Sequence, residues 1–194
     1  MELKLKHLFK DRKIQKTYLS INNGTPQYES GVIDIPVGET RLEDGRSRMT
    51  VKPDWRQSTV ISNKNPSRTN SACAVTDYSV LATAGNASFV ESSMVTGRKH
   101  QIRAHLGLGL GVPILGDHKF SHVDKLGKPQ RVMGDIVDRM KIKKTKARDL
   151  PIFLHARRIA IPDIFPDRNL VIKANLPHFF SKTLSTLKLK SKKF

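Results

Sequence analysis

The chain has 194 residues, long enough for one domain with a hydrophobic core and a tail. Its 35 lysines and arginines outnumber 17 aspartates and glutamates, giving a formal net charge of +18. This excess favours binding to polyanions, with RNA or DNA as first candidates, and does not specify a fold. The single cysteine, Cys73, excludes an internal disulfide and a cysteine-based zinc site. The sequence has no run of about 18 apolar residues, so we expect no membrane-spanning helix.

The alternation of apolar and polar residues predicts six short strands. They are residues 17–21, 31–36, 74–81, 87–92, 152–156 and 170–174. Apolar residues at helical spacing predict helices at 2–13, 99–108, near 134–142 and from 179 onward. Strands and helices do not follow each other regularly, as they would in a parallel α/β fold. We therefore expect an α+β fold with a mixed, largely antiparallel sheet and flanking helices.

Two long polar segments separate these elements. Residues 40–72 are rich in Arg, Ser, Asn and Pro, and we interpret them as a long excursion with little internal structure, in which Trp55 is a local anchor. Residues 121–150 form a second insertion. Shorter turns are predicted at residues 22–26 and at Gly85–Asn86, where the second turn closes a hairpin.

The segment 96–106 reads Thr-Gly-Arg-Lys-His-Gln-Ile-Arg-Ala-His-Leu and places Arg103 in an apolar, periodic stretch. We expect Thr96 and Gly97 to cap this helix. A buried Arg103 must be paired, because an isolated buried charge costs several kcal/mol. No upstream segment supplies an obvious acidic partner. The spacing alone therefore leaves open a cation held in a cleft for function, a structural salt bridge and an exposed helix cation.

Other candidate residues have ordinary explanations. Asp117 suits a catalytic acid, but we favour a turn aspartate that caps its own backbone. Residues 107–111 are glycine-rich but lack the strand and the Lys-Ser ending of a phosphate loop, which predicts a mobile turn. His100 and His105 are five residues apart with no glutamate between them, so we predict no metal site. Tyr18 is interpreted as a half-buried strand residue, with base stacking as the alternative.

Six motifs occur in the order seen in RNA pseudouridine synthases of the RluA type. They are Lys16-Thr17-Tyr18, residues 31–36, residues 74–78, residues 96–105, Ile114–Asp117 and Leu154-His155-Ala156. The chain resembles the C-terminal part of that family, and the likeness is greatest to a mitochondrial group of animals. The resemblance implies that residues 1–180 are the C-terminal portion of a catalytic domain and that residues 181–194 are a basic tail.

Members of that family convert a uridine in RNA to pseudouridine without a cofactor. The glycosidic bond breaks, the uracil rotates and its C5 bonds to the sugar, and the target base must first leave the stack. By resemblance, Tyr18 packs on the base, Arg103 pairs with the catalytic aspartate and Leu154 closes over the base. Five further residues are expected to bind RNA: Arg98, Lys99, His100, Lys119 and Arg157.

The resemblance also implies the partners and the location. The expected partners are rRNA and tRNA, with mRNA as a third candidate, and no membrane. The expected location is the mitochondrion, with the nucleus or cytoplasm as the alternative.

One motif of the family has no counterpart here. The catalytic aspartate belongs to a His-Arg-Leu-Asp segment that precedes the first predicted helix, and this sequence contains no such segment. We therefore expect an incomplete catalytic domain, from a fragment, a short isoform or a truncated gene model, which also lacks its targeting peptide and is inactive alone. The alternatives are a non-catalytic basic RNA-binding module and a ribosome-assembly protein without enzymatic ancestry.

Overall fold

The computed structural model describes residues 2–41, 45–52, 71–122, 128–165 and 168–191. Trp55, which we expected to be a local anchor, lies outside these residues. Among the helices in the described ranges, none is long and apolar enough to cross a membrane.

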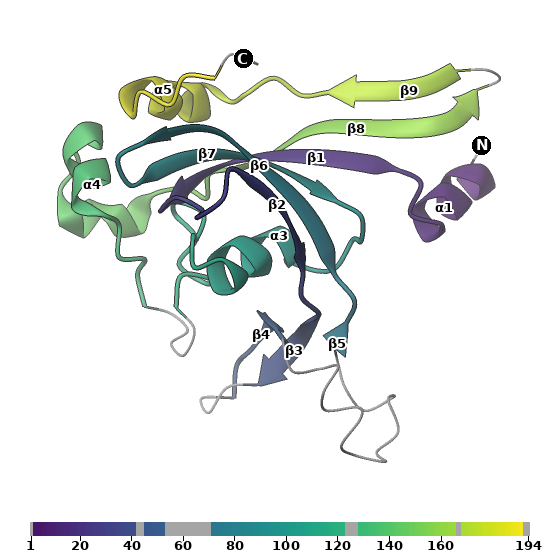
Figure 1. Ribbon diagram of the computed structural model, residues 1–194, viewed down its shortest axis with the longest axis horizontal. Helices are drawn as coiled ribbons and strands as arrows, with labels where there is room; N and C mark the ends of the chain where they lie inside the picture. Colours follow the sequence, from purple (N-terminus) through teal and green to yellow (C-terminus); the bar gives the residue numbers. More distant parts are fainter. Residues whose placement is uncertain (1, 42–44, 53–70, 123–127, 166–167, 192–194) are drawn as a thin grey trace.

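One six-stranded sheet organises the molecule (Figure 1). Its strands are β1 (Gln15–Asn23), β2 (Ser30–Asp34), β6 (Val75–Ala84), β7 (Ala87–Met94), β8 (Leu154–Phe165) and β9 (Arg168–Lys173). They lie in the order β2-β6-β7-β1-β8-β9, and neighbouring strands are antiparallel. The predicted α+β class and the β6–β7 hairpin are therefore confirmed. The strand predicted at residues 152–156 is the start of the much longer β8.

Helices cover the two faces of this sheet, as Figure 1 shows. On one face lies α5 (His178–Thr186), whose Phe180 ring has its centroid 6.3 Å from that of Phe89 and 5.8 Å from that of Phe153. On the other face lies α3 (Gln101–Ala104), which continues as a π-helix over His105–Gly109. Burial of apolar side chains against both faces accounts for most of the hydrophobic core.

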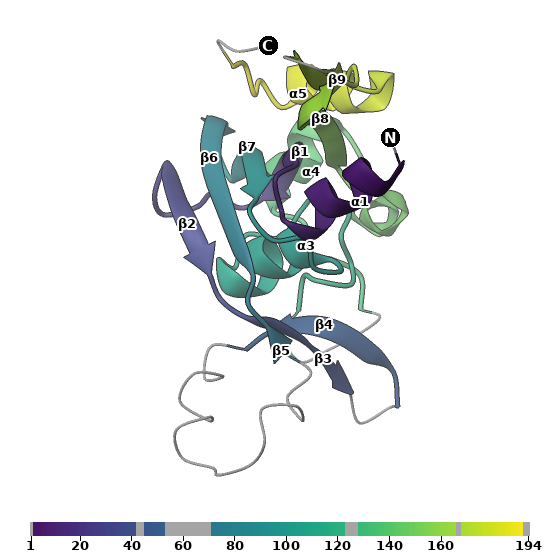
Figure 2. The same ribbon diagram turned by 90° about the vertical axis from the view of Figure 1, so that its right-hand side faces the viewer.

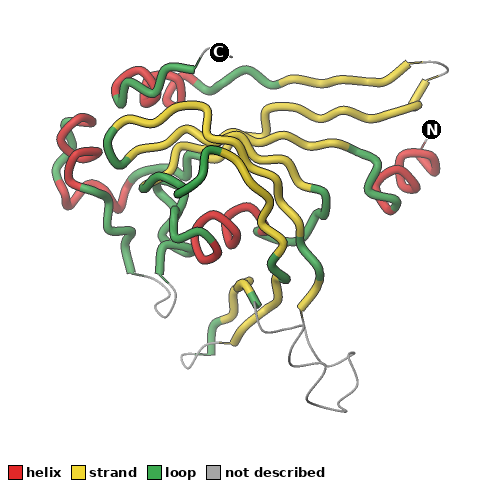
Figure 3. The backbone as a smooth tube through the Cα atoms, viewed as in Figure 1, coloured by secondary structure: helices red, strands yellow, loops and turns green. Residues whose placement is uncertain are grey.

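Two further helices lie at opposite ends of the sheet (Figures 1 and 3). Helix α1 (Glu2–Lys10) is anchored by Leu8, which is buried in one cluster with Ile14 and Ile161. Helix α4 (Gly134–Met140) is tied to the β6–β7 turn, because Asp135 accepts hydrogen bonds of 2.9 Å from the backbone and the side chain of Asn86. A 3-10 helix follows α4 at Lys144–Asp149. The helices predicted near 2–13 and 134–142 are confirmed.

The prediction of little structure in residues 40–72 is wrong for the described part of this segment, and residues 42–44 and 53–70 lie outside the described residues. A second, three-stranded sheet in the order β4-β3-β5 occupies part of this segment (Figure 2). Its strands are β3 (Val37–Arg41), β4 (Ser47–Val51) and β5 (Ser71–Ala72). The strands are short and their apolar residues are few, mainly Val37, Met49 and Val51, so polar residues dominate their sequence. Val37 packs in a cluster with Ala104 and Phe120, and this contact joins the small sheet to the α3 segment.

The packed body extends past residue 180. Leu184, Leu187 and Leu189 are buried in the main core, so the boundary expected at 180 falls inside α5. The basic side chains that follow Leu189 come after this packed segment. The division into a catalytic portion and a tail stays a prediction.

The mobile turn predicted at residues 107–111 is also wrong, because Gly107 and Gly109 lie inside the π-helix. Gly107 is buried, and a Cβ at this position would overlap the backbone carbonyl of Phe120. Gly109 has room, since the nearest atom to a Cβ there would be Ile35 Cδ1 at 3.5 Å. The first of these glycines thus lets the helix approach the loop that carries Phe120.

A matched pair of substitutions tests this close approach. Replacing glycine by alanine inside a helix usually stabilises a protein by about 0.5–1 kcal/mol, and we expect Gly109→Ala to be neutral or to stabilise in this way. Gly107→Ala should instead destabilise by about 1–3 kcal/mol, as overpacking does. Urea unfolding of the two variants measures the difference. Equal effects at both positions would show that the helix and the loop are not in contact.

Candidate functional site

The face of the sheet that α3 covers also carries Tyr18 and Leu154. The hydroxyl of Thr76 bonds to Gln101 and His105 and therefore points to this face. Residues opposite one another in antiparallel strands share a face. The relevant pairs are Thr76↔Met94, Tyr78↔Ser92, Tyr18↔Ser92, Tyr18↔Ala156 and Ser20↔Leu154. Tyr18 and Leu154 are thus diagonal neighbours on one face, a distance that large side chains span.

A groove of about 340 Å³ opens beside Tyr18. The described residues that line it are Lys16, Tyr18, Ala156, Arg157, Arg158, Ile159, Ile172 and Ala174. Its aliphatic and aromatic side chains could pack on the flat face of a base, while its three cations could pair with phosphates. None of these lining residues carries a carboxylate. Burial raises the pKa of Tyr18, so its phenol is neutral at physiological pH.

A β-bulge sets the direction of Arg157 in this groove. Thr17 pairs with Arg158 and Tyr18 with Ala156, so Arg157 is the extra residue on β8. The Arg157 guanidinium donates to the carbonyl of Ala174, and the Ala174 N–H donates back to the Arg157 carbonyl at 2.9 Å. Bulges redirect side chains beside functional sites. Here the bulge leaves a cation on the groove wall next to Tyr18.

Arg103 has an acidic partner, and the partner is Asp117. Arg103 Nε donates to Asp117 Oδ2 at 2.7 Å, and Nη2 donates to Oδ1 at 2.8 Å. The Asp117 side chain is fully buried and that of Arg103 is 17% exposed. Two parallel charge-assisted bonds fix the plane of the guanidinium. The expectation named only the upstream segments as lacking an acidic partner; the partner, Asp117, lies 14 residues downstream of Arg103.

The turn role that we favoured for Asp117 is its lesser role. Its Oδ1 does accept the backbone N–H of Phe120, at 3.2 Å. The two shortest hydrogen bonds that the carboxylate accepts nevertheless come from Arg103. A catalytic acid is not favoured either, since both oxygens are engaged and buried. Asp117 is best described as the structural counter-ion of Arg103.

Aromatic side chains enclose the exposed edge of this pair. Arg103 Cζ lies 4.7 Å from the centroid of the Phe120 ring, and the ring of His100 lies 5.6 Å from that of Phe120. Arg103 Nη1 is 3.4 Å from His100 Nδ1. Burial lowers the pKa of His100, and the charges of Arg103, Lys119 and Lys99 lower it further. The cluster therefore keeps His100 neutral and leaves Nη1 as the least engaged donor of Arg103.

A buried polar network holds the other side of the α3 segment. Thr76 Oγ1 accepts from Gln101 Nε2 at 2.9 Å and donates to His105 Nδ1 at 2.9 Å. His105 Nε2 must be protonated, since its partner at 2.8 Å is the carbonyl of Ile35. Gln101 Oε1 accepts from the Thr96 hydroxyl at 2.8 Å. Every donor in this hydrogen-bond network has an acceptor. The network therefore holds the helical turn that carries Arg103 in a fixed position.

Thr96 and Gly97 do not cap the helix as predicted. The residue before α3 is His100, which has left-handed backbone angles, and no side chain caps the helix N-terminus. The Thr96 hydroxyl is instead committed to the side chain of Gln101. The Thr96 hydroxyl could either cap the helix or bind another side chain, and the sequence pattern does not distinguish these two roles.

The structure divides the predicted site residues between two places. Tyr18 and Arg157 line the groove, and Leu154 shares the face of Tyr18. Arg103, His100 and Lys119 gather at the Asp117 cluster, and Arg98 and Lys99 are exposed on the loop that leads to it. Sequence reasoning missed four contributors: Lys16, Arg158, Gln101 and His105. The Gln101–Thr76 and His105–Thr76 bonds join distant segments, so no local spacing reveals them.

Metal ligation has no clear candidate in the described part of the chain, since no three His, Cys, Asp or Glu side chains gather there. Both ring nitrogens of His105 are occupied by protein partners.

Comparison with known proteins places this geometry in a family. The family model described as RNA pseudouridylate synthase matches residues 1–107, more than half of the chain. The chain belongs to the RNA pseudouridylate synthase family. Four of the six ordered motifs, those within residues 16–18, 31–36, 74–78 and 96–105, lie inside the matched residues.

Relatives match nearly all of this chain. Mitochondrial pseudouridylate synthase RPUSD4 of Mus musculus is 35% identical over 192 residues, and that of Homo sapiens is 36% identical over 194. Each alignment covers 97% of this chain and 51% of the relative, so the chain spans about half the length of the curated relatives it matches. Ribosomal large subunit pseudouridine synthase C of Rickettsia bellii is 29% identical over 181 residues, which are 93% of this chain and 48% of that protein.

A solved structure supports the fold of this chain. Human RNA pseudouridylate synthase domain containing 4 superposes with a TM-score of 0.79 at 32% identity, over 97% of this chain and 67% of that one. The α+β assignment is confirmed by this likeness as well as by the sheet itself.

Because Asp117 is fully buried, removing its partner should destabilise the fold. We expect Arg103→Ala to cost about 3–5 kcal/mol of unfolding free energy, since it leaves an uncompensated buried charge. The double substitution Arg103→Met, Asp117→Leu should cost less, because neither charge remains. Arg98→Ala, on the exposed loop, is the control and should change stability by less than about 0.5 kcal/mol. Urea unfolding decides, and a loss below about 1 kcal/mol for Arg103→Ala would show that the pair is solvated.

The buried histidine predicts a pH dependence of stability. Burial lowers the pKa of His105 below its ordinary value of 6.5, so the unfolded chain binds a proton more readily than the folded chain. Stability is then complete above pH 6.5 and falls as the pH drops below it. Thermal unfolding across this range measures the loss. His105→Gln should flatten part of the curve, and His100→Gln the remainder. An unchanged slope in both variants would assign the effect to other groups.

Proposed function

We propose that this chain carries the base-binding part of an enzyme that isomerises uridine in RNA to pseudouridine. The observation that carries the proposal is the groove beside Tyr18, on the face that also presents Leu154. A base that has left its stack needs an apolar surface on which to pack and cations for its phosphates. The groove offers both in a chain of the RNA pseudouridylate synthase family.

The roles proposed for three residues rest on the family motifs to which they belong, and their positions are compatible with these roles. The Tyr18 ring packs on the uracil, and Leu154 covers it from the neighbouring strand. Arg103 orients a catalytic carboxylate. Its Nε and Nη2 donate to Asp117, so Nη1 is the donor that can bind this second carboxylate. Such an arginine favours the ionised carboxylate and fixes its direction. No carboxylate lines the groove among the described residues, so the reacting aspartate comes from outside it.

RNA contacts are proposed for five basic residues that flank this face. Arg98, Lys99, His100 and Lys119 lie around the Arg103 cluster, and Arg157 lies in the groove. We propose rRNA and tRNA as substrates and mRNA as a third candidate. The Rickettsia relative is named for the large ribosomal subunit, which supports rRNA. The relatives named mitochondrial support that location, with the nucleus or cytoplasm as the alternative.

A second function is favoured by the same absence of a carboxylate from the groove lining. The chain alone would then be a basic RNA-binding module that positions a uridine and does not convert it. A structural ribosome-assembly role without enzymatic ancestry is not favoured, since the chain belongs to an enzyme family.

Incubation of the pure chain with mitochondrial large-subunit rRNA, followed by pseudouridine mapping, separates these functions. We expect no pseudouridine from the chain alone, because positioning without the reactive group leaves binding only. The full-length mouse relative serves as the positive control. Conversion by the chain alone would contradict the proposal that the chain positions a uridine without converting it.

Binding of the same RNA should be weakened strongly by salt. A formal charge of +18 implies several phosphate contacts, and log affinity then falls linearly with log salt. Tyr18→Ala should weaken binding to oligouridylate by a further amount, since stacking is worth about 1–3 kcal/mol per base. A flat salt dependence, or no effect of Tyr18→Ala, would contradict the proposed function.

A further inference from the structure

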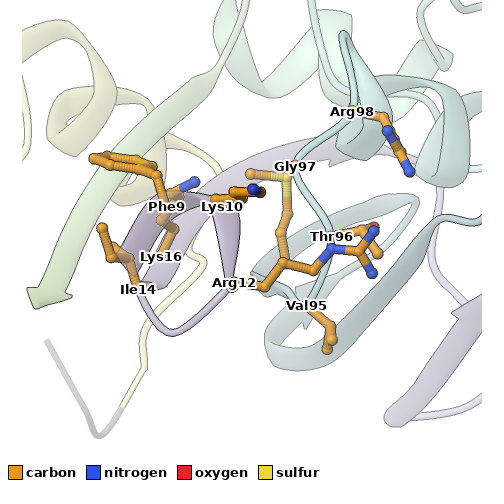
Figure 4. A pocket seen from close by; sticks show the side chains of 10 residues that line it. Phe9, Lys10, Arg12, Ile14, Lys16, Val95, Thr96, Gly97 and Arg98 are labelled. Carbon is orange, nitrogen blue, oxygen red and sulfur yellow. The ribbon is translucent and has the colours of Figure 1, made fainter. Parts of the chain in front are cut away.

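A second pocket, of about 290 Å³, lies where the end of α1, the start of β1 and the loop after β7 meet (Figure 4). Its cationic side chains are Lys10, Arg12, Lys16 and Arg98. None of the residues that line it is acidic, and within the described ranges no salt bridge joins these four cations to a carboxylate. Gathered cations without counter-ions repel one another. The pocket is therefore suited to an anion.

The backbone conformation of Arg12 indicates that its side chain has a function. Arg12 has a φ of 58°, in the left-handed region, where α1 ends with its N–H donating to the Phe9 carbonyl at 3.2 Å. Glycine is preferred at this position of a helix end because a Cβ is strained there. Cations near a helix C-terminus also interact favourably with the helix dipole, and this interaction accounts for Lys10 and Arg12. That effect does not account for Lys16 and Arg98, which belong to other segments.

Lys16 connects this pocket to the groove. It lines both, and it precedes Tyr18 by two residues on β1, so both side chains point to the same face. Its Nζ lies 4.9 Å from the centroid of the Phe9 ring, which is half exposed. Gly97 lies close to Lys16 in this pocket, since a Cβ at Gly97 would be in van der Waals contact with Lys16 Nζ, at 3.7 Å. Lys16 therefore places one cation at the junction of the groove and the pocket.

We propose that the pocket binds a backbone phosphate of the RNA strand whose uridine occupies the Tyr18 groove. The proposal rests on the proposed function and adds a second anchor to it. Arg12 and Arg98 supply planar forks that match phosphate oxygens, and Lys10 and Lys16 supply point charges. The anchor fixes the strand on one side of the target base and so selects which nucleotide enters the groove.

Fluorescence anisotropy with a fluorescein-labelled oligouridylate of about 16 nucleotides tests this on the full chain. The pocket variant is Arg12→Gly with Arg98→Ala, and Arg12→Gly keeps the helix end by giving it the residue that its backbone favours. The control variant is Lys182→Ala with Lys190→Ala, which removes the same charge from exposed positions in and after α5. Figure 1 shows α5 and α1 at opposite ends of the molecule.

The pocket variant should bind about tenfold more weakly at low salt, equivalent to ~1.4 kcal/mol. Its plot of log affinity against log salt should be shallower by about 0.7 for each lost phosphate contact. The control variant should change both quantities much less. Equal effects of the two variants overturn the proposal, and so does displacement of the RNA by polyglutamate through the same four cations, which would identify an acidic polypeptide as the occupant.

Tyr18→Ala separates this inference from the proposed function. If Tyr18→Ala weakens binding while the pocket variant matches its control, the groove stands and the phosphate anchor falls. If only the pocket variant weakens binding and flattens the salt dependence, the anchor stands and the assignment of the groove to a base falls.

Discussion

The buried ion pair between Arg103 and Asp117 is the interaction on which the rest of the site depends. It joins the α3 segment to the loop that follows Gly116, and the two residues are 14 positions apart in the sequence. The same loop packs Phe120 against Gly107, and Arg48 of the small sheet donates to its carbonyls at Lys119 and His122. The ion pair thus helps to hold the α3 segment, this loop and the small sheet together, because a buried charge requires a partner of opposite charge.

The period of the β-strand is the second constraint. Alternate residues of β1 serve two purposes: Leu19 and Ile21 are fully buried, while Tyr18 points to the face of α3 and the groove. A shift of one residue in the β1–β8 register would exchange these sets, and Tyr18 would enter the core. The bulge at Arg157 occurs beside this point and redirects a cation without disturbing the pairing beyond it. Core packing and site geometry are therefore set by one register.

Local patterns in the sequence predict the elements well and their long-range partners poorly. Alternation located the main strands, and the hairpin at Gly85–Asn86 follows from turn chemistry. The rule that a buried arginine needs an anion was sound, but the identity of Asp117 depends on tertiary folding. The small sheet that begins at Val37 was missed because its short strands contain few apolar residues and therefore resemble a polar loop. The second pocket was missed because its four cations come from separate segments. Family motifs supplied the roles proposed for Tyr18, Arg103 and Leu154, which spacing alone left open.

The central claim is that the groove beside Tyr18 receives the uridine base. Photo-crosslinking with RNA that carries one 4-thiouridine, followed by peptide mapping, tests it most directly, because only residues in contact with the base react. We expect the crosslink in the β1 peptide that contains Tyr18 or in the first half of β8, and we expect Tyr18→Ala to weaken it. A crosslink confined to α5 or to β9 beyond the groove, unchanged in Tyr18→Ala, would contradict the account.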